Sequence, residues 1–248
     1  MIRLIALRKT YGGKDALKGL ELHISPGEVF GFLGPNGAGK TTTMRLIAGL
    51  VRPTSGRILI EGIDTAEDPI NAKARLGYIP DRPYLYDRLT GLETMQFIGE
   101  MYGLLAREVV KRAEELLTRF GIFHAKDQLA ETYSHGMKQR LALAAALLHE
   151  PRALLIDEPM VGLDPKGAKL VKTVLREEAA RGSGVFLSTH SLAVAEEVCD
   201  RIGILQHGRL IALGTVAELK SQAGVDTGLE EIFLKLTEEA AEDAVLSP

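Results

Sequence analysis

The chain has 248 residues, of which 46% are hydrophobic and 25% are charged, a composition that excludes disordered and fibrous classes. A formal net charge of −3, with no block of Lys or Arg, argues against a nucleic-acid-binding surface. The single Cys199 allows no internal disulfide, and no apolar run approaches the roughly 20 residues of a membrane-spanning helix, so we expect a reduced, cytoplasmic protein.

The first third of the chain alternates short apolar runs with turn clusters, which predicts strands. These runs are residues 2–7, 20–24, 29–33, 58–60 and 76–79. One helix is predicted over residues 40–50, because Met44, Ile47 and Leu50 follow a glycine-rich turn at helical spacing. Tight turns separate several of the strands, so we expect an antiparallel edge in this part.

The segment of residues 81–150 has a helical pattern instead. Thr90 and Glu93 have the spacing of a capping box at the start of its first helix. The expected helices are residues 92–102, 106–120 and 135–149. The segment is therefore predicted to be a helical subdomain inserted between strands.

Strands and helices alternate in the rest of the chain. Strands are expected over residues 153–156, 185–188 and 202–206, with helices over residues 165–180 and 191–198 between them. Parallel strands require helical crossovers, so the alternation predicts an α/β core formed by residues 1–80 and 151–222. Thr227 and Glu230 predict the start of a C-terminal helix, and residues 223–248 end in an acidic tail. The whole chain is expected to form one domain.

Residues 34–41 match the pattern G-x-x-x-x-G-K-[ST] between an expected strand and an expected helix. Glycines let backbone N–H groups approach phosphates closely, and the positive end of the helix adds to the attraction. Lys40 is expected to contact the β- and γ-phosphates, and the Thr41 hydroxyl to bind Mg²⁺. The expected nucleotide-binding residues are Gly34, Pro35, Asn36, Gly37, Ala38, Gly39, Lys40, Thr41 and Thr42. The alternative is a plain glycine turn between a strand and a helix.

The buried strand pattern of residues 153–156 continues directly into Asp157 and Glu158. Such a pair is often a solvated loop, but beside a phosphate loop it indicates hydrolysis. Asp157 is expected to hold Mg²⁺ through its water shell, and Glu158 to polarise the attacking water as general base. The strand pattern of residues 185–188 leads to His190, for which a γ-phosphate is the natural ligand. These groups favour an ATPase over a phosphotransferase, which has to exclude water.

Over roughly residues 2–220, the chain resembles the ATP-binding subunits of ATP-binding-cassette (ABC) transporters. The diagnostic Leu-Ser-Gly-Gly-Gln pattern corresponds here to Tyr-Ser-His-Gly-Met at residues 133–137, and Gly-Leu-Asp-Pro at 162–165 is similar to the D-loop. His190 is similar to the switch histidine, and Tyr11 to the aromatic residue that stacks on adenine, although Tyr11 also fits a half-buried core position. The resemblance implies an α/β P-loop NTPase (RecA-like) fold that binds ATP and Mg²⁺.

In the family, ATP lies between two subunits, so the resemblance implies a pair of this chain with itself or with a paralogue. Ser134 is a good N-cap, Gly136 permits close backbone approach, and the helix behind them would direct its positive end at the γ-phosphate of the other copy. Asp164 is expected to act across the dimer too. Because every expected part of the site occurs in one chain, a homodimer is favoured.

Three positions depart from the family pattern. Asp81, in Tyr-Ile-Pro-Asp, stands where the family usually has Gln, and its carboxylate can reach Mg²⁺ or a water. His135 and Met137 replace Gly and Gln of the diagnostic pattern. In this form the two loops are similar to those of bacterial exporter ATPases whose membrane part is a separate chain.

The resemblance therefore implies an ATPase that dimerises around two Mg·ATP and powers substrate movement, in the direction of export, through a separate transmembrane permease. The protein is expected on the inner face of the cell membrane, with the permease near Asp81 and residues 84–92. One alternative is a non-transport ABC ATPase acting on DNA or ribosomes, although no nucleic acid is expected as a partner. A P-loop kinase and an ATP-binding scaffold are the others, and a kinase should lack the element from Ser134 to Gly136.

Overall fold

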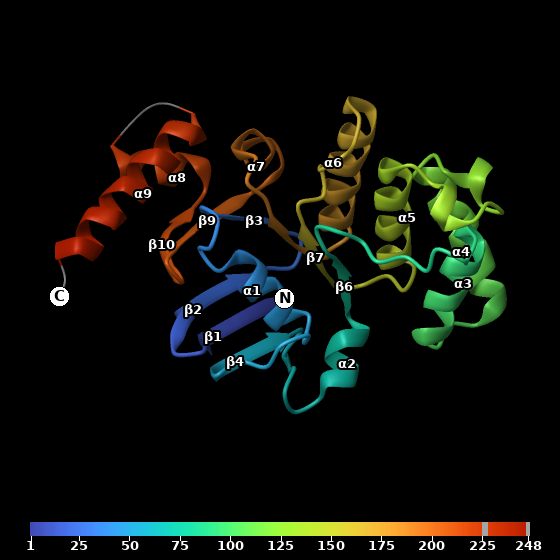
Figure 1. Cartoon of the computed structure of the whole chain (residues 1–248), viewed down its shortest axis with the longest axis horizontal. Helices are drawn as coiled ribbons and strands as arrows, with labels where there is room; N and C mark the ends of the chain where they lie inside the picture. The colour runs from blue at the N-terminus through green and yellow to red at the C-terminus, as the bar shows by residue number, and fades with distance from the viewer. Residues whose placement is uncertain (225–227, 247–248) are drawn as a thin grey trace.

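The computed structural model describes residues 1–224 and 228–246, and within them the strands form two sheets (Figure 1). The larger sheet has the order β10-β9-β3-β8-β7-β6, in which β10 is antiparallel to β9 and the other strands are parallel. Its strands are β3 (Val29–Leu33), β6 (Leu76–Ile79), β7 (Ala153–Asp157), β8 (Gly184–Ser188), β9 (Arg201–Gln206) and β10 (Arg209–Gly214). The strands β3, β7 and β8 are buried along their whole length, which explains their continuous apolar sequence.

The expected antiparallel strands form a sheet of their own, with the order β2-β1-β4-β5. Its strands are β1 (Ile2–Tyr11), β2 (Lys14–Ile24), β4 (Ser55–Ile60) and β5 (Ile63–Asp64). The first two are longer than their apolar runs, because paired polar residues on the exposed face continue each strand. Gly12 and Gly13, both at positive φ, form the tight turn between them.

Helices cover the parallel sheet on both faces. The helices in the described part of the chain are α1 (Lys40–Ile47), α2 (Pro69–Ala74), α3 (Gly91–Met101), α4 (Ala106–Arg119), α5 (His135–Leu147), α6 (Pro165–Ala180), α7 (Leu192–Val198), α8 (Val216–Ala223) and α9 (Leu229–Leu246). On one face, Met44 of α1 packs in a core that also contains Leu4 of β1 and Phe186 of β8. On the other face, Val171 of α6 packs in a second core with Leu187 of β8. The helix α1 is thus enclosed by both sheets.

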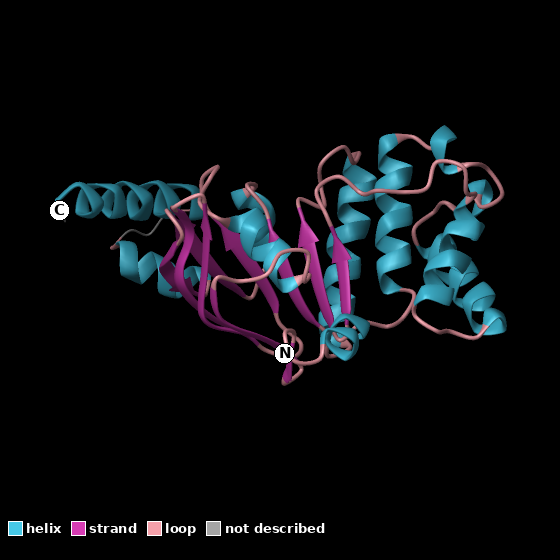
Figure 2. Cartoon of the chain, turned by 60° about the horizontal axis from the view of Figure 1, so that its bottom comes forward, coloured by secondary structure: helices cyan, strands magenta, loops and turns pink. Residues whose placement is uncertain are grey.

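The helices α3, α4 and α5 gather at one end of the molecule and α8 and α9 at the other, with the strands between them (Figures 1 and 2). The predicted capping box is confirmed, since Thr90 and Glu93 exchange both bonds at the start of α3. Sequence reasoning missed α2, which begins where the N–H of Asn71 donates to Asp68 Oδ1 at 3.2 Å. It also missed β5, β10 and α8. Thr227, expected to cap the last helix, lies outside the described residues.

Two sets of polar contacts join α3, α4 and α5 to the rest of the molecule. Arg119 of α4 donates from Nη1 to Glu178 Oε1 of α6 at 2.9 Å. The Leu76 carbonyl of β6 accepts from the hydroxyl of Tyr102 at 3.4 Å and lies 3.2 Å from Nε2 of His149. Within residues 1–224 and 228–246, none of the helices combines the length and the apolar character that crossing a lipid bilayer requires.

Candidate active site

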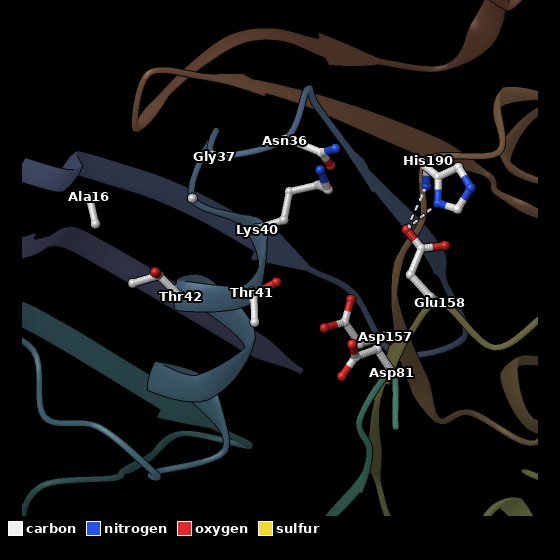
Figure 3. A pocket seen from close by; sticks show the side chains of 11 residues that line it. Ala16, Asn36, Gly37, Lys40, Thr41, Thr42, Asp81, Asp157, Glu158 and His190 are labelled. Atoms are coloured by element: carbon white, nitrogen blue, oxygen red, sulfur yellow. Dashed lines mark hydrogen bonds and ion pairs between the residues drawn. The ribbon is translucent and has the colours of Figure 1, made fainter. Parts of the chain in front are cut away.

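A cavity of about 390 Å³ lies at the carboxyl ends of β3, β6 and β7, beside the end of β8 (Figure 3). Its lining residues are Ala16, Asn36, Gly37, Gly39, Lys40, Thr41, Thr42, Asp81, Asp157, Glu158 and His190. Parallel strands bring their carboxyl ends to one edge of a sheet, so the fold collects residues there from segments far apart in the chain. The cavity joins the expected phosphate loop to the expected hydrolytic residues.

The turn between β3 and α1 depends on glycines at two positions. Gly34 has a φ of +157°, and a Cβ there would collide with the carbonyl oxygen of Leu205. Gly39 has a φ of +117°, and a Cβ there would lie 2.7 Å from the carbonyl oxygen of Ala16. Both neighbours are backbone atoms, which do not move aside as a flexible side chain does. The turn is therefore packed against β9 and β2, with the N-terminus of α1 directed at the cavity.

Lys40, the first residue of α1, directs its ammonium group back along the turn. Its Nζ donates to the carbonyl oxygens of Gly34 at 2.5 Å and Pro35 at 3.2 Å. Burial lowers the pKa of Lys40, and the negative charges of Glu158 and Asp157 oppose that shift. The cavity therefore holds one cationic and several anionic groups within electrostatic range of each other.

Asp157 is the last residue of β7 and is 4% exposed. Burial raises the pKa of Asp157, and the charges of Asp81 and Glu158 add to the rise, whereas the hydroxyl of Ser188 and the charge of Lys40 oppose it. A bound cation would relieve both effects. Among the described residues, no group of three or more His, Cys, Asp or Glu side chains is arranged to hold a metal ion. The oxygen donors of Thr41, Asp81 and Asp157 fit Mg²⁺, which takes one or two carboxylates together with phosphate oxygens and waters.

Glu158 follows β7 in a left-handed conformation, with a φ of +50°. Its N–H donates to the Ser188 carbonyl at 2.9 Å. Its Oε1 accepts the backbone N–H of His190 at 2.8 Å and lies 2.8 Å from the Nδ1 of that residue (Figure 3). Its Oε2 accepts the hydroxyl of Thr189 at 3.1 Å. An ionised carboxylate has no proton to give, so the imidazole hydrogen lies on Nδ1. The residues after β8 thus hold both carboxylate oxygens.

Ser134, Gly136 and Asp164, the residues expected to act across a dimer, do not line this cavity. Ser134 caps α5, since its Oγ accepts the N–H of Met137 at 3.3 Å, and Asp164 caps α6 through the N–H of Gly167 at 2.9 Å. The start of α5 contacts the loop before α6, because the imidazole of His135 occupies the space that a Cβ on Gly162 would take.

Tyr11 and some residues of the phosphate loop also lie outside the lining of this cavity. Tyr11 is 46% exposed at the end of β1, with the Nζ of Lys9 4.7 Å from its ring centroid. Ala38 is buried, and Gly34 and Pro35 line a smaller neighbouring cavity with Phe233 of α9. Sequence reasoning missed Ala16 and Thr189. Ala16 is brought to the site by the pairing of β2, which no local sequence pattern indicates. For Thr189, the only indication in the sequence was its position directly before His190.

Known proteins resemble this chain over most of its length. The family model described as ABC transporter matches residues 17–161. The linearmycin resistance ATP-binding protein LnrL of Bacillus subtilis (strain 168) is 40% identical over 242 residues, which cover 94% of this chain and 78% of that protein. A solved ATP-binding subunit of an ABC transporter superposes with a TM-score of 0.91 at 35% identity, covering 96% of this chain and 99% of the other.

A second solved structure is a dimer. It is the post-hydrolysis state of the ATP-binding cassette MJ0796 bound to ADP and Pi, with a TM-score of 0.80 and 28% identity, covering 87% of this chain and 98% of that one. Dimerisation and the products of ATP hydrolysis are thus recorded for a protein of the same fold.

Proposed function

Since the chain belongs to the ABC transporter family, as an ATP-binding and ATP-hydrolysing subunit, we propose that it binds Mg·ATP in the cavity between the phosphate loop and Glu158. The observation that carries this assignment is the cavity itself, in which Lys40 and the N-terminus of α1, which follows the glycine-rich turn, lie opposite Asp157 and Glu158. Such an arrangement combines donors for a phosphate chain with a carboxylate that can accept a proton from water.

Each residue of the cavity then has a distinct task. The backbone N–H groups of residues 37–41 and the ammonium of Lys40 bind the phosphates. Thr41, Asp157 and Asp81 would hold Mg²⁺, which when bound neutralises charge on the β- and γ-phosphates. Glu158 accepts the proton of the attacking water, and the imidazole of His190 turns its N–H toward the γ-phosphate. This division of tasks uses both the cation and the anions that line the cavity.

The adenine base is assigned to the open side of the cavity at the β1–β2 hairpin. Ala16 of β2 lines the cavity there, and the exposed ring of Tyr11 ends the neighbouring strand β1. An exposed aromatic ring offers a flat surface for stacking at little cost in desolvation. We assign the base to Tyr11 on these grounds.

The site is completed by a second copy of the chain. Ser134 and Gly136 stand at the positive end of α5 but do not reach the cavity of their own chain. In a closed pair, this helix start would face the γ-phosphate bound by the other copy, with Asp164 beside it. The dimeric relative supports such a pair, and the complete set of residues in one chain favours a homodimer.

An apolar groove is the proposed contact with a separate transmembrane permease. A cavity of about 220 Å³ is lined by Pro80, Pro83, Leu85, Phe97 and Ile98, and by Tyr78, Tyr84, Tyr86 and Tyr102. Tyr84 is 96% exposed, which is unusual for a large aromatic side chain. The groove begins directly beside Asp81, so movement at the nucleotide reaches the partner through a few residues. A permease segment with an apolar face fits this groove and would hold the ATPase on the inner face of the membrane.

Export is the proposed direction of transport. LnrL carries resistance to linearmycin in its name, and removal of a toxic compound is the simplest route to resistance for a transporter. Neither the family match nor the relatives favour a role on DNA or ribosomes.

The variant Glu158→Gln tests the assignment. It should bind ATP as the wild type does, lose turnover and accumulate as an ATP-bound dimer, seen as a doubled mass in light scattering. Glu230→Gln, which changes an exposed carboxylate on α9, serves as the control and should hydrolyse ATP normally. An unchanged hydrolysis rate in Glu158→Gln would remove Glu158 from its role, and a monomer with saturating ATP would contradict the dimer.

A further inference from the structure

Thr189 connects three segments that meet at the active site. It follows β8 and is 1% exposed, whereas most of the imidazole of His190 faces solvent. Its backbone N–H donates to the Phe32 carbonyl of β3 at 3.4 Å, directly before the phosphate loop. Its hydroxyl lies 3.1 Å from Glu158 Oε2 and 3.1 Å from the backbone nitrogen of Ser191. One small buried side chain thus contacts the catalytic carboxylate and the start of α7.

The direction of the two hydroxyl bonds follows from the groups involved. The N–H of Ser191 can only donate, so the Thr189 oxygen accepts there. The single hydroxyl proton then goes to Glu158, whose ionised carboxylate can only accept. The Ser191 side chain accepts the N–H of Val194 at the start of α7. Because Ser191 is fixed at the start of α7, the hydroxyl proton of Thr189 points to Glu158.

These bonds determine which part of Glu158 meets water. A carboxylate has about four acceptor positions. The N–H and Nδ1–H of His190 use two on Oε1, and Thr189 uses one on Oε2. With the imidazole in this position, the remaining acceptor position is on Oε2, next to the bond from Thr189. The hydroxyl of Thr189 therefore fixes the orientation of the oxygen that is free to accept a proton.

We propose that Thr189 is a positioning residue of ATP hydrolysis, which holds Glu158 so that Oε2 accepts the proton of the attacking water. The proposal rests on the role of general base proposed for Glu158. In the step, the water oxygen forms a bond to the γ-phosphorus, the bond from that phosphorus to the β–γ bridging oxygen breaks with its electrons on ADP, and the water proton passes to Oε2. Thr189 is unchanged throughout.

Burial explains why Thr189 is needed in addition to His190. The imidazole of His190 is 70% exposed and can turn toward a γ-phosphate, which breaks its bond to Glu158. Thr189 is enclosed by β3 and α7 and has no such freedom. When the imidazole of His190 turns, the bond from Thr189 to Oε2 persists together with the backbone N–H bond of His190 to Oε1, so the carboxylate keeps its direction during the reaction.

The first experiment compares four variants of the full chain in steady-state hydrolysis and Mg·ATP binding. Thr189→Val removes the hydroxyl at nearly constant volume and should lower kcat about ten- to a hundredfold, as expected for a lost hydrogen bond to a charged group. KM and the Kd for Mg·ATP should stay within about twofold, because no nucleotide contact is lost. Thr189→Ser should restore most of the rate. Thr189→Ala should match Thr189→Val, and it replaces that variant if valine impairs folding.

The matched control is Ser183→Ala. Ser183 is a buried residue at the other end of β8, and its hydroxyl donates to the Pro151 carbonyl at 3.0 Å. Its loss should leave kcat unchanged, which separates the effect of position from that of losing a buried hydroxyl. Equal rates in Thr189→Val and the wild type, or an equal loss in Ser183→Ala, would overturn the proposal.

The second experiment places Thr189→Val in the Glu158→Gln background and measures residual single-turnover hydrolysis. If Thr189 acts through Glu158, the double variant should be no slower than Glu158→Gln. A further tenfold loss in that background would show an independent effect and refute the positioning role. Full activity of Glu158→Gln itself would instead refute the proposed function, so the two failures are distinguishable.

Discussion

Replacing His149 with Phe should flatten the dependence of stability on pH below neutrality. The His149 ring stacks on Tyr102 with ring centroids 3.7 Å apart and an interplanar angle of 10°. Its Nε2 lies 3.2 Å from the Leu76 carbonyl, so this nitrogen carries the hydrogen. Its Nδ1 is buried, with no hydrogen-bond partner among the described residues. Burial lowers the pKa of His149 from 6.5 to about 4, against a smaller opposing effect of the Leu76 carbonyl.

The direction of the pH dependence follows from comparing the protonation of His149 in the folded and the unfolded chain. Between pH 6.5 and pH 4, the unfolded chain binds a proton at this position and the native protein does not. The stability that His149 contributes is therefore present above pH 6.5 and is lost as the pH falls toward 4. The full loss is roughly 3 kcal/mol, since one pKa unit corresponds to about 1.4 kcal/mol. Between pH 7 and pH 5, the free energy of unfolding should fall by about 2 kcal/mol through this group alone.

The assay is urea unfolding of the wild type and His149→Phe at pH 7 and pH 5. Phenylalanine keeps the stack on Tyr102, whose hydroxyl still donates to the Leu76 carbonyl. The pKa of His23 is also lowered, mainly by burial, but His23 titrates in both proteins and cancels in the comparison. The exposed His124, changed to Gln, is the control and should keep the wild-type dependence on pH. Equal losses of stability in the wild type and His149→Phe would refute this account of His149.

Three further results are expected. Asp157→Asn should raise the unfolding midpoint of the nucleotide-free protein at pH 7 while abolishing hydrolysis. Because the pKa of Asp157 is raised, its contribution to stability is present below pH 3.8 and is lost as the pH rises. Thermal scans should therefore show that the higher midpoint of the variant disappears near pH 4. Gly39→Ala should lose ATP binding in a filter or calorimetric assay and lower the free energy of unfolding by about 1–3 kcal/mol. The reason is that the new Cβ would lie 2.7 Å from the Ala16 carbonyl oxygen, on a backbone in the left-handed conformation. Unchanged affinity for ATP would show that the loop can shift. Ser134→Ala should lower the free energy of unfolding by about 1 kcal/mol, because the bond from the Met137 N–H is lost. In the Glu158→Gln background, it should also shift the mass measured by light scattering from dimer to monomer. A persistent dimer would place the interface elsewhere.

The parts of the fold that could be read from sequence are those that a local pattern specifies. The strands β3, β7 and β8 are buried on both faces, so each appears as an unbroken apolar run and was predicted almost to the residue. The box of Thr90 and Glu93 is also local, since its bonds span three residues. Elements that were missed, such as α2 and β10, are short, and their partners decide whether they form. The length of β1 depends likewise on pairing with β2.

The sequence by itself determined which chemical groups are available for the proposed binding of a phosphate chain and activation of a water, because the motifs that carry them are continuous stretches with fixed spacing. Only the tertiary structure decided how Glu158 is held. Pairing of β7 with β8 places Asp157 opposite Ser188, and this register brings Thr189 and His190 to both oxygens of the next carboxylate. The register depends on burial across a whole sheet, a property of contacts between distant segments that no local pattern contains.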